Sequence, residues 1–266
     1  MSVDYVKDDH VVLITINRYE RRNALDVEHA QELLKAWRDF RDDLDAWVAI
    51  ITGVKNAFCA GGDLRIMGDI AEELRTTGES PTQALYQDAD GGSPTLKNFP
   101  IFKPIIAAVN GYCMAGGMEM LGGTDIRIAS TDAVFSVSEP RRGLIAGGGT
   151  TARLPRQLAW PAAMEILLTA GNIDANRALQ LGLVNEVVPR EELHEAAFRW
   201  AREICKNAPL AVQGTKKSAL LGFGTGALAQ AYAIEDAATI EVFSTEDATE
   251  GARAFTEKRA PVWKGR

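Results

Sequence analysis

The sequence predicts an α/β core followed by a helical C-terminal part. Short apolar segments rich in β-branched residues alternate with amphipathic segments of helical spacing up to about residue 190, and only helical patterns follow. Alternation of this kind is typical of a core in which helices cover a sheet. The length of 266 residues suits one large domain, or one domain with an appendage.

Three segments in the first half of the chain are predicted to be buried strands. Each is short and apolar, and they span residues 11–17, 47–53 and 103–111. Residues 66–100, in contrast, are polar and contain the turn-forming stretches TTGESPTQ and DADGGSP. We expect a helix and a mobile loop there.

The segment between the first two strands is the clearest helix of the sequence. It covers residues 27–44, and Asp26 stands where a capping side chain is expected. Its large apolar residues recur at helical spacing and form one stripe, made of Leu33, Leu34, Trp37 and Phe40. Such a stripe predicts an amphipathic helix packed on the strands.

The second half of the chain begins with strands and ends with helices. Residues 125–130 and 133–138, DIRIAS and AVFSVS, look like the two strands of a hairpin. From Trp160 onward helical patterns dominate, including an amphipathic segment that stops before Pro209. The final stretch, STEDATEGARAF, is expected to start a last short helix.

Composition and charge exclude several classes of protein. The net charge of −7, from 29 basic and 36 acidic residues, argues against a general nucleic-acid binder, which would carry a basic stripe. No apolar run approaches the roughly 20 residues of a membrane helix, and the first twelve residues lack the apolar core of a signal peptide. We therefore expect neither a nucleic-acid nor a membrane partner.

The cysteines suggest a reducing compartment. Cys59, Cys113 and Cys205 are odd in number and widely spaced, so they indicate neither a disulfide framework nor a zinc site. Reduced thiols are the rule in the cytoplasm. The sequence thus predicts a cytoplasmic protein without a bound metal.

Two glycine-rich loops share one design. NAFCAGGDL (56–64) and NGYCMAGGMEM (110–120) each follow an apolar strand and present small residues before a helix. The start of a helix leaves backbone N–H groups unpaired and carries a partial positive charge. Two such groups that converge on one point could hold a carbonyl oxygen as it gains negative charge. Taken alone, the local pattern also fits two ordinary glycine turns.

The ordered set of motifs is more specific than either loop. RRNALD, AFCAGGDL, AAVNGYCMAGGMEM and FSVSEPRRGLIAGGGTTARL follow one another at a spacing that resembles the enoyl-CoA hydratase/isomerase (crotonase) family. The resemblance runs from about Val3 to Lys264. It implies a ββα spiral core with the CoA and catalytic sites in residues 1–195, and a helical trimerisation region in 196–266. Members are commonly trimers or dimers of trimers.

The resemblance also implies how the site works. The backbone N–H groups of Gly62 and Gly116 would hold the thioester oxygen of an acyl-CoA, and Glu119 and Glu139 would supply acid and base chemistry. Two glutamates at these positions are typical of members that add water to a trans-2-enoyl-CoA and give a 3-hydroxyacyl-CoA, as in fatty-acid β-oxidation. Without the family pattern, Glu119 would be an ordinary charge near a helix start and Glu139 a solvated loop acid.

Two departures from the family pattern concern the surroundings of Glu139 and the first loop. Arg141 and Arg142 follow Glu139 where apolar residues are common, and a guanidinium turned toward the carboxyl would lower its pKa. We expect both arginines to point away. Tyr19 stands where proline is common, which we expect to be neutral.

Coenzyme A would lie between the RRNAL loop and the helix after GGD, as part of the substrate and not as a separate cofactor. The residues expected to touch it are Arg22, Ala24, Ala60, Asp63, Leu64 and Arg65. Arg65 could meet a phosphate, although a solvated helix arginine is nearly as good a reading. Phe255 and Lys258 match positions at which an adjacent subunit contributes to the nucleotide end.

Other functions remain open at this stage. On the same fold, a Δ3–Δ2 enoyl-CoA isomerase commonly keeps only the equivalent of Glu139, and dehydration of a hydroxyacyl-CoA such as a carnitinyl-CoA is the reverse reaction. Hydrolysis through Cys59 or Cys113 needs a nearby base, and none of the three histidines (His10, His29 and His194) adjoins the glycine loops. A non-catalytic acyl-CoA binder would need neither glutamate. AGGGTTARL matches neither a P-loop nor a Rossmann fingerprint.

Overall fold

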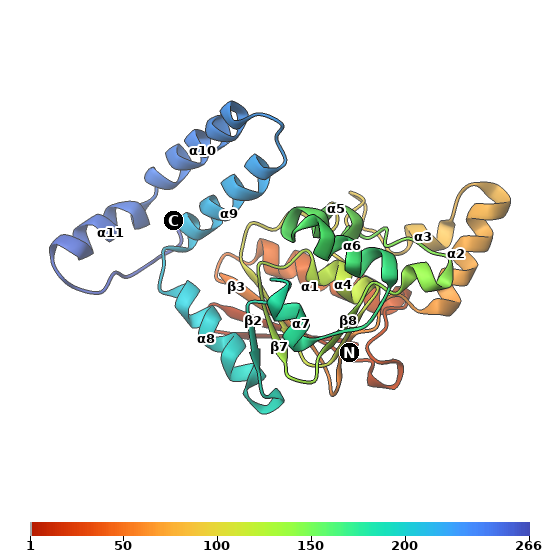
Figure 1. The fold of residues 1–266 in the computed structure, drawn as a ribbon. Coiled ribbons are helices and arrows are strands. Elements are labelled where there is room, and N and C mark those ends of the chain that lie inside the picture. Colours follow the sequence, from red (N-terminus) through yellow and green to blue (C-terminus); the bar gives the residue numbers. More distant parts are fainter. Residues whose placement is uncertain (1) are drawn as a thin grey trace.

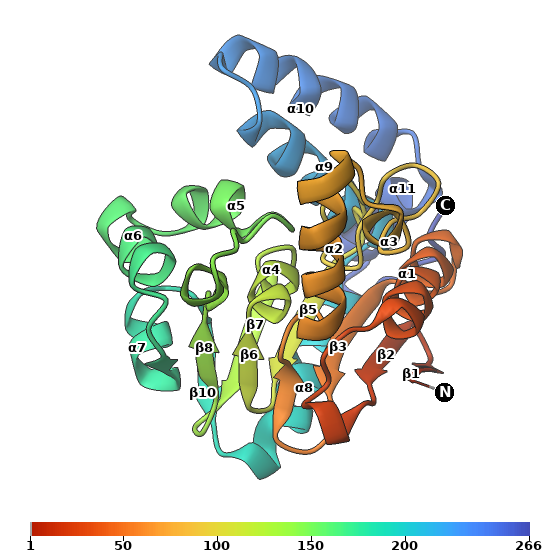
Figure 2. The same ribbon diagram turned by 90° about the vertical axis from the view of Figure 1, so that its right-hand side faces the viewer.

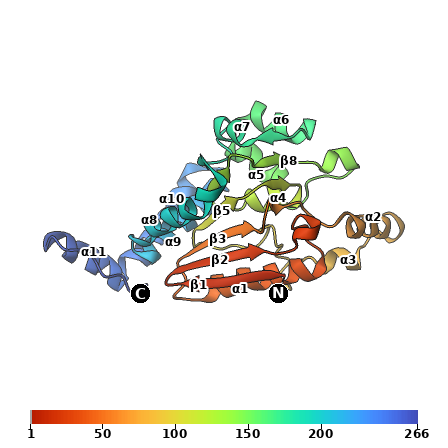
Figure 3. The same cartoon turned by 90° about the horizontal axis from the view of Figure 1, so that it is seen from below.

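The computed structural model describes residues 2–266 and contains two sheets that share one core. The larger sheet has six strands, all parallel except for the antiparallel pair of its first two. In spatial order they are β1 (Val3–Asp8), β2 (Val11–Ile16), β3 (Val48–Gly53), β5 (Ile105–Val109), β7 (Ile126–Ser130) and β10 (Glu186–Val188). Figure 3 shows the strands β1, β2, β3 and β5 side by side. The α/β prediction is confirmed.

The smaller sheet is built from short strands and lies beside the larger one (Figure 2). Its order is β4 (Ala57–Cys59), β6 (Tyr112–Met114), β8 (Val134–Ser136) and β9 (Ile173–Asp174). The first three strands are parallel, and β9 is antiparallel to β8. Parallel strands end at one edge of a sheet, so the segments that follow β4, β6 and β8 meet there.

One unit occurs three times along the chain, although the sequence has no visible repeat. A strand of the larger sheet is followed by a strand of the smaller sheet and then by a helical segment. These segments are the helices α2 (Leu64–Thr77) and α4 (Gly116–Leu121) and the 3-10 turn η2 (Glu139–Arg142). The three units give the ββα core that the resemblance implied.

The hairpin predicted for residues 125–138 is wrong. Both strands exist, as β7 and β8, but they belong to different sheets. Strand β7 pairs in parallel with β5 and β10, whereas β8 pairs with β6 and β9. The chain leaves the larger sheet at Ser130, and β7 and β8 each pair in parallel with a strand of the preceding ββα unit, β5 and β6 respectively.

The helix predicted at residues 27–44 is α1 (Val27–Asp42). Asp26 caps it, since its carboxylate accepts a hydrogen bond from the His29 amide at 3.0 Å. The predicted apolar stripe, Leu33, Leu34, Trp37 and Phe40, is fully buried in the larger core cluster. Burial of side chains this large stabilises the fold by roughly 1.5–3 kcal/mol each, so the stripe fixes the helix on the strands.

The remaining helices of the core surround the sheets. They are α3 (Pro81–Ala84), α5 (Thr150–Gln157), α6 (Trp160–Thr169), α7 (Ala175–Gln180) and α8 (Leu193–Cys205), with the 3-10 turns η1 (Tyr19–Arg21) and η3 (Arg190–Glu192). The amphipathic segment predicted to stop before Pro209 is α8. Its face of Leu193, Ala196, Ala197 and Ala201 packs on a second core cluster that includes Ile50 and Ile106.

The last three helices form an arm that extends from the core, at the end opposite α2 and α3 (Figures 1 and 3). They are α9 (Pro209–Phe223), α10 (Leu228–Phe243) and α11 (Glu246–Thr256). The helical prediction for this stretch is confirmed. Large apolar side chains lie exposed on the arm: Leu220, Leu221, Phe223, Leu228, Tyr232, Ile240, Phe243 and Phe255. The predicted division of the chain at residues 195 and 196 remains a prediction.

Candidate active site

The first glycine loop leads from β4 into α2 and has a backbone conformation that favours glycine. Gly61 adopts φ +97°, and a Cβ there would lie 2.9 Å from the Gly116 amide nitrogen. Only glycine meets both conditions without cost. Leu25 fixes the loop from the other side through a β-bridge to Gly62.

The second glycine loop starts α4 and lies directly against the first. A Cβ on Gly117 would come within 2.2 Å of the Cys59 carbonyl oxygen, so α4 approaches β4 through backbone alone. A Cβ on Gly116 would lie 3.4 Å from the Gly62 amide nitrogen. Among residues 2–266, neither the Gly62 nor the Gly116 amide donates a backbone hydrogen bond outside regular secondary structure. Two donors are thus available side by side, as in an oxyanion hole.

Glu119 lies on α4, whose six residues are all buried. Its carboxylate accepts a hydrogen bond from the Gly148 amide. Burial raises the pKa of Glu119 above its ordinary value, while the Gly148 amide and the cations Lys97 and Arg153 lower it. The Gly148 amide thus holds the carboxylate in place and favours its ionised form, against the effect of burial.

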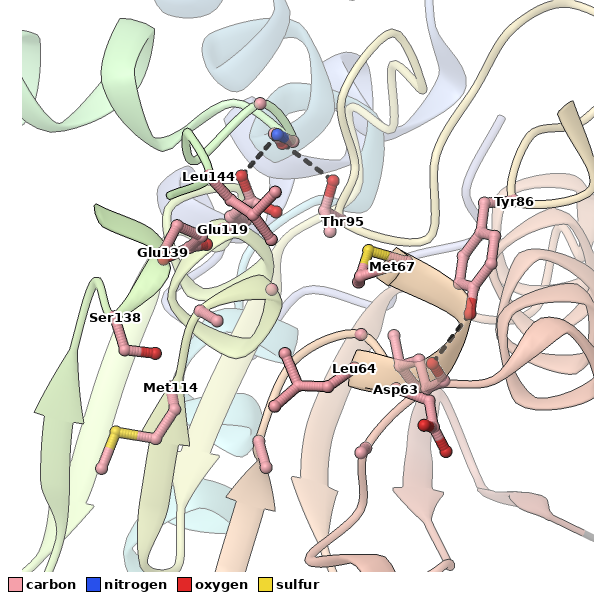
Figure 4. A pocket seen from close by; sticks show the side chains of 18 of the residues that line it. Asp63, Leu64, Met67, Tyr86, Thr95, Met114, Glu119, Ser138, Glu139 and Leu144 are labelled. Carbon is pink, nitrogen blue, oxygen red and sulfur yellow. Dashed lines mark hydrogen bonds between the residues drawn. The ribbon is translucent and has the colours of Figure 1, made fainter. Parts of the chain in front are cut away.

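Glu139 begins η2 and is the only buried residue of that turn. Its Oε2 atom is buried and has no hydrogen-bond partner among residues 2–266. Burial raises its pKa to about 7, and the proximity of Glu119 contributes in the same direction. Figure 4 shows the two glutamates next to each other below Leu144. At neutral pH the pair can therefore hold one proton acceptor and one proton donor.

The two arginines after Glu139 are exposed. Arg142 donates a hydrogen bond to the Ser138 carbonyl oxygen at 3.0 Å, which holds its guanidinium at the cavity mouth. It lowers the pKa of Glu139, but burial dominates and the pKa stays raised. A lowered pKa of Glu139, which an arginine turned toward the carboxyl would cause, is therefore not found.

Both glutamates and both glycine loops line one cavity of about 1070 Å³. This volume lies slightly above the usual range for small-molecule sites and suits a large ligand. All six residues predicted to touch coenzyme A also line it: Arg22, Ala24, Ala60, Asp63, Leu64 and Arg65. Asp63 has a structural task as well, because it caps α2 through the Arg65 amide and pairs with Arg18 at 3.0 Å.

Phe255 and Lys258, the other two residues predicted at the CoA site, lie away from this cavity. Phe255 is on α11 and Lys258 follows it, in the arm opposite α2 (Figure 1). Phe255 is 85% exposed. Within one chain these residues cannot reach the cavity, so their predicted role depends on an adjacent subunit.

Several lining residues were missed by the sequence analysis. Gly148 holds Glu119, and Thr95 in turn donates its hydroxyl to the Gly148 carbonyl oxygen at 2.8 Å. Tyr86 donates its hydroxyl to the Leu25 carbonyl oxygen at 3.1 Å, next to the bridge with Gly62 (Figure 4). The run AGGGTT was the only available sign for Gly148. Thr95 and Tyr86 lie in the polar stretch 66–100, where no pattern singles them out.

A thiol nucleophile is disfavoured by burial. Cys59 and Cys113 are fully buried, and burial raises the pKa of the Cys59 thiol to about 12. None of the three histidines lines the cavity. Because the thiolate is the reactive form, this arrangement does not support attack by cysteine.

We also searched the described residues for a metal-binding group and for a membrane-spanning helix. Over residues 2–266, no group of three or more His, Cys, Asp and Glu side chains is placed to hold a metal ion. In the same residues, no helix combines the length and apolarity needed to cross a membrane.

Comparison with known proteins agrees with this geometry. The model of the enoyl-CoA hydratase/isomerase family matches residues 7–266. The chain belongs to that family. The resemblance inferred from the ordered motifs is therefore confirmed, and so is the fold that it implied.

Relatives within the enoyl-CoA hydratase/isomerase family span the whole chain. The (E)-benzylidenesuccinyl-CoA hydratase of Thauera aromatica is 37% identical over 100% of both chains, and the enoyl-CoA hydratase EchA19 of Mycobacterium tuberculosis is 38% identical over 97% of this chain and 94% of its own. The carnitinyl-CoA dehydratase of Citrobacter koseri is 34% identical over 100% of this chain and 99% of its own.

A solved enoyl-CoA hydratase/isomerase structure has the same architecture. The crystal structure of enoyl-CoA hydratase from Mycobacterium tuberculosis matches with a TM-score of 0.89 and 35% identity, covering 100% of this chain and 99% of its own. The named relatives are hydratases and dehydratases. The protein is accordingly an enzyme of the hydro-lyase type, from a family whose members named here act on CoA thioesters.

Proposed function

We propose that this protein adds water reversibly to a trans-2-enoyl-CoA and gives a 3-hydroxyacyl-CoA. The observation that carries the proposal is the pair of buried carboxylates, Glu119 and Glu139, in one cavity beside two available amides. Addition of H and OH across a double bond needs a proton acceptor and a proton donor on the same substrate. The two carboxylates differ in hydrogen bonding as that requirement demands.

The thioester oxygen would lie between the amides of Gly62 and Gly116. As hydroxide adds at C3, negative charge moves through C2 and C1 to this oxygen. Fixed N–H donors stabilise such charge without reorganisation, and loss of one donor typically costs about 10²- to 10³-fold in rate. Backbone donors suit the task because the close packing of Gly61 and Gly116 holds them in place.

Glu119 would act as the base and Glu139 as the acid. The ionised Glu119 takes a proton from water while the water oxygen forms the bond to C3. The neutral carboxyl of Glu139 then gives its proton to C2, and the enolate electrons form the new C–H bond. At the end Glu119 carries a proton and Glu139 is ionised, so one proton must pass back before the next turnover.

The CoA part would lie along the mouth of the cavity, between the loop at Arg22 and Ala24 and the start of α2. Arg22 and Arg65 offer guanidinium groups for phosphate oxygens there, and Ala60 leaves room for the chain of the pantetheine. CoA would be part of the substrate and no other cofactor would be needed.

The decisive experiment follows the loss of the conjugated-thioester absorbance of crotonyl-CoA. Wild type should hydrate it, and Glu119→Gln and Glu139→Gln should each lower kcat by about 10²- to 10⁴-fold, because each removes one proton-transfer group. A wild type that binds crotonyl-CoA without hydrating it would identify an acyl-CoA binder. Movement of a 3-enoyl double bond without hydration would identify an isomerase.

A second candidate is dehydration of a hydroxyacyl-CoA, which uses the same groups in reverse. It is favoured by the relatives named carnitinyl-CoA dehydratase at 34–36% identity over most of the chain. A panel of enoyl-CoA and 3-hydroxyacyl-CoA substrates of different length and branching would decide which acyl group and which direction the enzyme prefers.

We further propose that the arm joins copies of this chain into a trimer or a dimer of trimers. Exposed apolar side chains on α9–α11, such as Phe223, Ile240 and Phe243, support this assembly. In it, Phe255 and Lys258 would reach the CoA site of a neighbour. Light scattering at micromolar concentration should give a multiple of three chains, and a monomer would contradict the assembly.

A further inference from the structure

Arg153, on helix α5, is partly buried between the segments that carry Glu119 and Thr95. Among residues 2–266 it forms no ion pair, and its guanidinium instead donates to three backbone carbonyl oxygens. They are those of Thr95 at 2.9 Å, Glu119 at 3.1 Å and Leu96 at 2.5 Å. A planar guanidinium with several fixed donors can bind main-chain segments from different elements at one point.

These hydrogen bonds form part of a closed circuit that starts and ends at Glu119. Arg153 binds the main chain of both Glu119 and Thr95, and the Thr95 hydroxyl donates to the Gly148 carbonyl oxygen at 2.8 Å. The Gly148 amide then donates to the Glu119 carboxylate (Figure 4). The circuit therefore fixes both the backbone and the carboxylate of the same residue.

Two cations lie near Glu119, and Arg153 is the more buried of the two. The titratable and charged groups that face Glu119 are Lys97 from the 85–104 loop, Arg153 from α5, Glu139 from η2 and Cys59 from β4. Lys97 is exposed and donates to the Gly147 carbonyl oxygen at 2.7 Å, whereas Arg153 is partly buried. Burial lowers the pKa of Arg153, and Glu119 opposes that effect.

We propose that Arg153 is a positioning residue of this site: through the circuit of hydrogen bonds it holds the Glu119 carboxylate against Gly148, in the position from which it acts as the base. A desolvated cation is unfavourable unless a negative charge compensates it, and Glu119 is the acid that does so here. The coupling is mutual, so loss of the guanidinium makes the ionised form of Glu119 less favourable. The inference rests on the proposed role of Glu119 as a base.

The test compares Arg153→Met and Arg153→Lys with Arg156→Met. Arg156 is the matched control because it lies on the same helix and is exposed. Among residues 2–266 its side chain donates only to the Ala152 carbonyl oxygen of its own helix. Displacement of a catalytic group by a distant change can cost about 10²-fold, and we expect that loss in kcat for Arg153→Met with crotonyl-CoA, with little change in KM.

The pH profile separates positioning from a merely structural role. In Arg153→Met the acidic limb of kcat/KM should move upward by about one pH unit or more, because a nearby opposite charge lowers a carboxyl pKa by that order. Arg153→Lys keeps the positive charge but loses some of the guanidinium N–H donors. It should therefore return the acidic limb to its wild-type position and recover only part of kcat. A profile and rate for Arg153→Met equal to those of Arg156→Met would overturn the proposal.

A second variant covers the outcome in which Arg153→Met fails to fold. Thr95→Val removes the hydroxyl that joins Thr95 to Gly148 and should lower kcat by up to about tenfold, while Thr95→Ser keeps the hydroxyl and should recover most of that loss. Equal rates for Thr95→Val and wild type would contradict the circuit.

A measurement without substrate separates this proposal from the proposed function. Carbon-13 NMR titration of the Glu119 carboxyl, assigned through Glu119→Gln, should show a higher pKa in Arg153→Met than in wild type. If wild type adds no water to any enoyl-CoA, the proposed function fails while this titration still reports the coupling. If wild type hydrates and the titration does not move, the positioning role fails alone.

Discussion

Helix α4 and the turn η2 each deliver one carboxylate to the same cavity, but they hold it differently. On α4 every residue is buried, and Glu119 accepts a hydrogen bond from the Gly148 amide. On η2 only Glu139 is buried, and its Oε2 atom has no partner among residues 2–266. Burial raises the pKa of both carboxyls, but the Gly148 amide, Lys97 and Arg153 oppose this effect at Glu119, whereas the proximity of Glu119 adds to it at Glu139.

This difference teaches that the role of a carboxylate is set by its surroundings and not by its type. A carboxylate that accepts a fixed N–H bond beside cations favours the ionised form, and a buried one without partners favours the neutral form. Pairs of titratable groups whose environments separate their pKa values are the usual acid and base of an enzyme.

We expect the largest effect in an exchange experiment that tests the acid, Glu139, separately from the base, Glu119. In heavy water, wild type should exchange the C2 proton of a saturated acyl-CoA, because ionised Glu139 can remove it and the two amides stabilise the enolate. Glu139→Gln should lose this exchange by up to about 10⁴-fold, while Glu119→Gln should keep it. NMR of the C2 position measures the rate. Loss of exchange in Glu119→Gln alone would reverse the assignment of acid and base.

The next largest effect concerns the contact between Gly148 and the Glu119 carboxylate. A Cβ on Gly148 would lie 2.3 Å from the Glu119 Oε2 atom, so Gly148→Ala must displace the carboxylate. We expect kcat to fall by about 10²-fold with little change in the unfolding midpoint, because the displaced group is the end of a flexible side chain. Gly147→Ala is the control, since its nearest heavy atom would be the Ile145 carbonyl oxygen at 3.9 Å. Equal activities would show that the position of Glu119 is not critical.

A smaller effect concerns stability and the Glu139 side. Its pKa of about 7 in the folded state lies above the ordinary 4.5, so the folded protein favours the proton. The associated stability is present below the unfolded pKa and is lost as the pH rises through the folded pKa. Glu139→Gln avoids this loss and should be about 2 kcal/mol more stable than wild type at pH 6.

Urea unfolding at several pH values measures this gain. The difference between Glu139→Gln and wild type should shrink toward pH 4, where wild type is protonated in both states. Glu191→Gln, a change of an exposed residue in the turn η3, should leave the pH dependence as it is in wild type. A gain that does not vary with pH would mean that ionisation of Glu139 is not its cause.

The smallest effect is the basic limb of the rate profile. If Glu139 must be protonated to deliver H to C2, kcat/KM for hydration should fall about tenfold per pH unit above about pH 7, the pKa of this carboxyl. Initial rates with crotonyl-CoA in buffers of constant ionic strength measure it. A rate that stays constant well above that pH would assign the proton to another donor.

Much of the site could be predicted because it depends on short motifs. The glycines at 61, 62, 116 and 117 stand out in the sequence as small residues after apolar strands, and their close packing explains why larger residues are excluded. Thr95, Tyr86 and Arg153 could not be predicted. They act through main-chain atoms of distant segments, and such contacts leave no mark in the local pattern.

The fold shows the same division between local and distant information. The apolar stripe and cap of α1 determined a helix on their own, because spacing and capping act within one or two turns. The short strands β4 and β6 escaped prediction, and β7 and β8 were paired with each other in error. Three-residue strands carry too few side chains to show a period, and pairing depends on which strands the chain brings together.

By itself, the sequence determined helix α1, several buried strands, the glycine loops and the two glutamates, since these follow from local spacing and from the order of motifs. Only the tertiary structure decided that β4, β6 and β8 lie in parallel, so that Gly62, Glu119 and Glu139 meet at one edge. It also decided how the glutamates differ. Burial, the Gly148 amide and Arg153 act across distances of many residues in the chain, and a carboxyl pKa responds to what surrounds it in space.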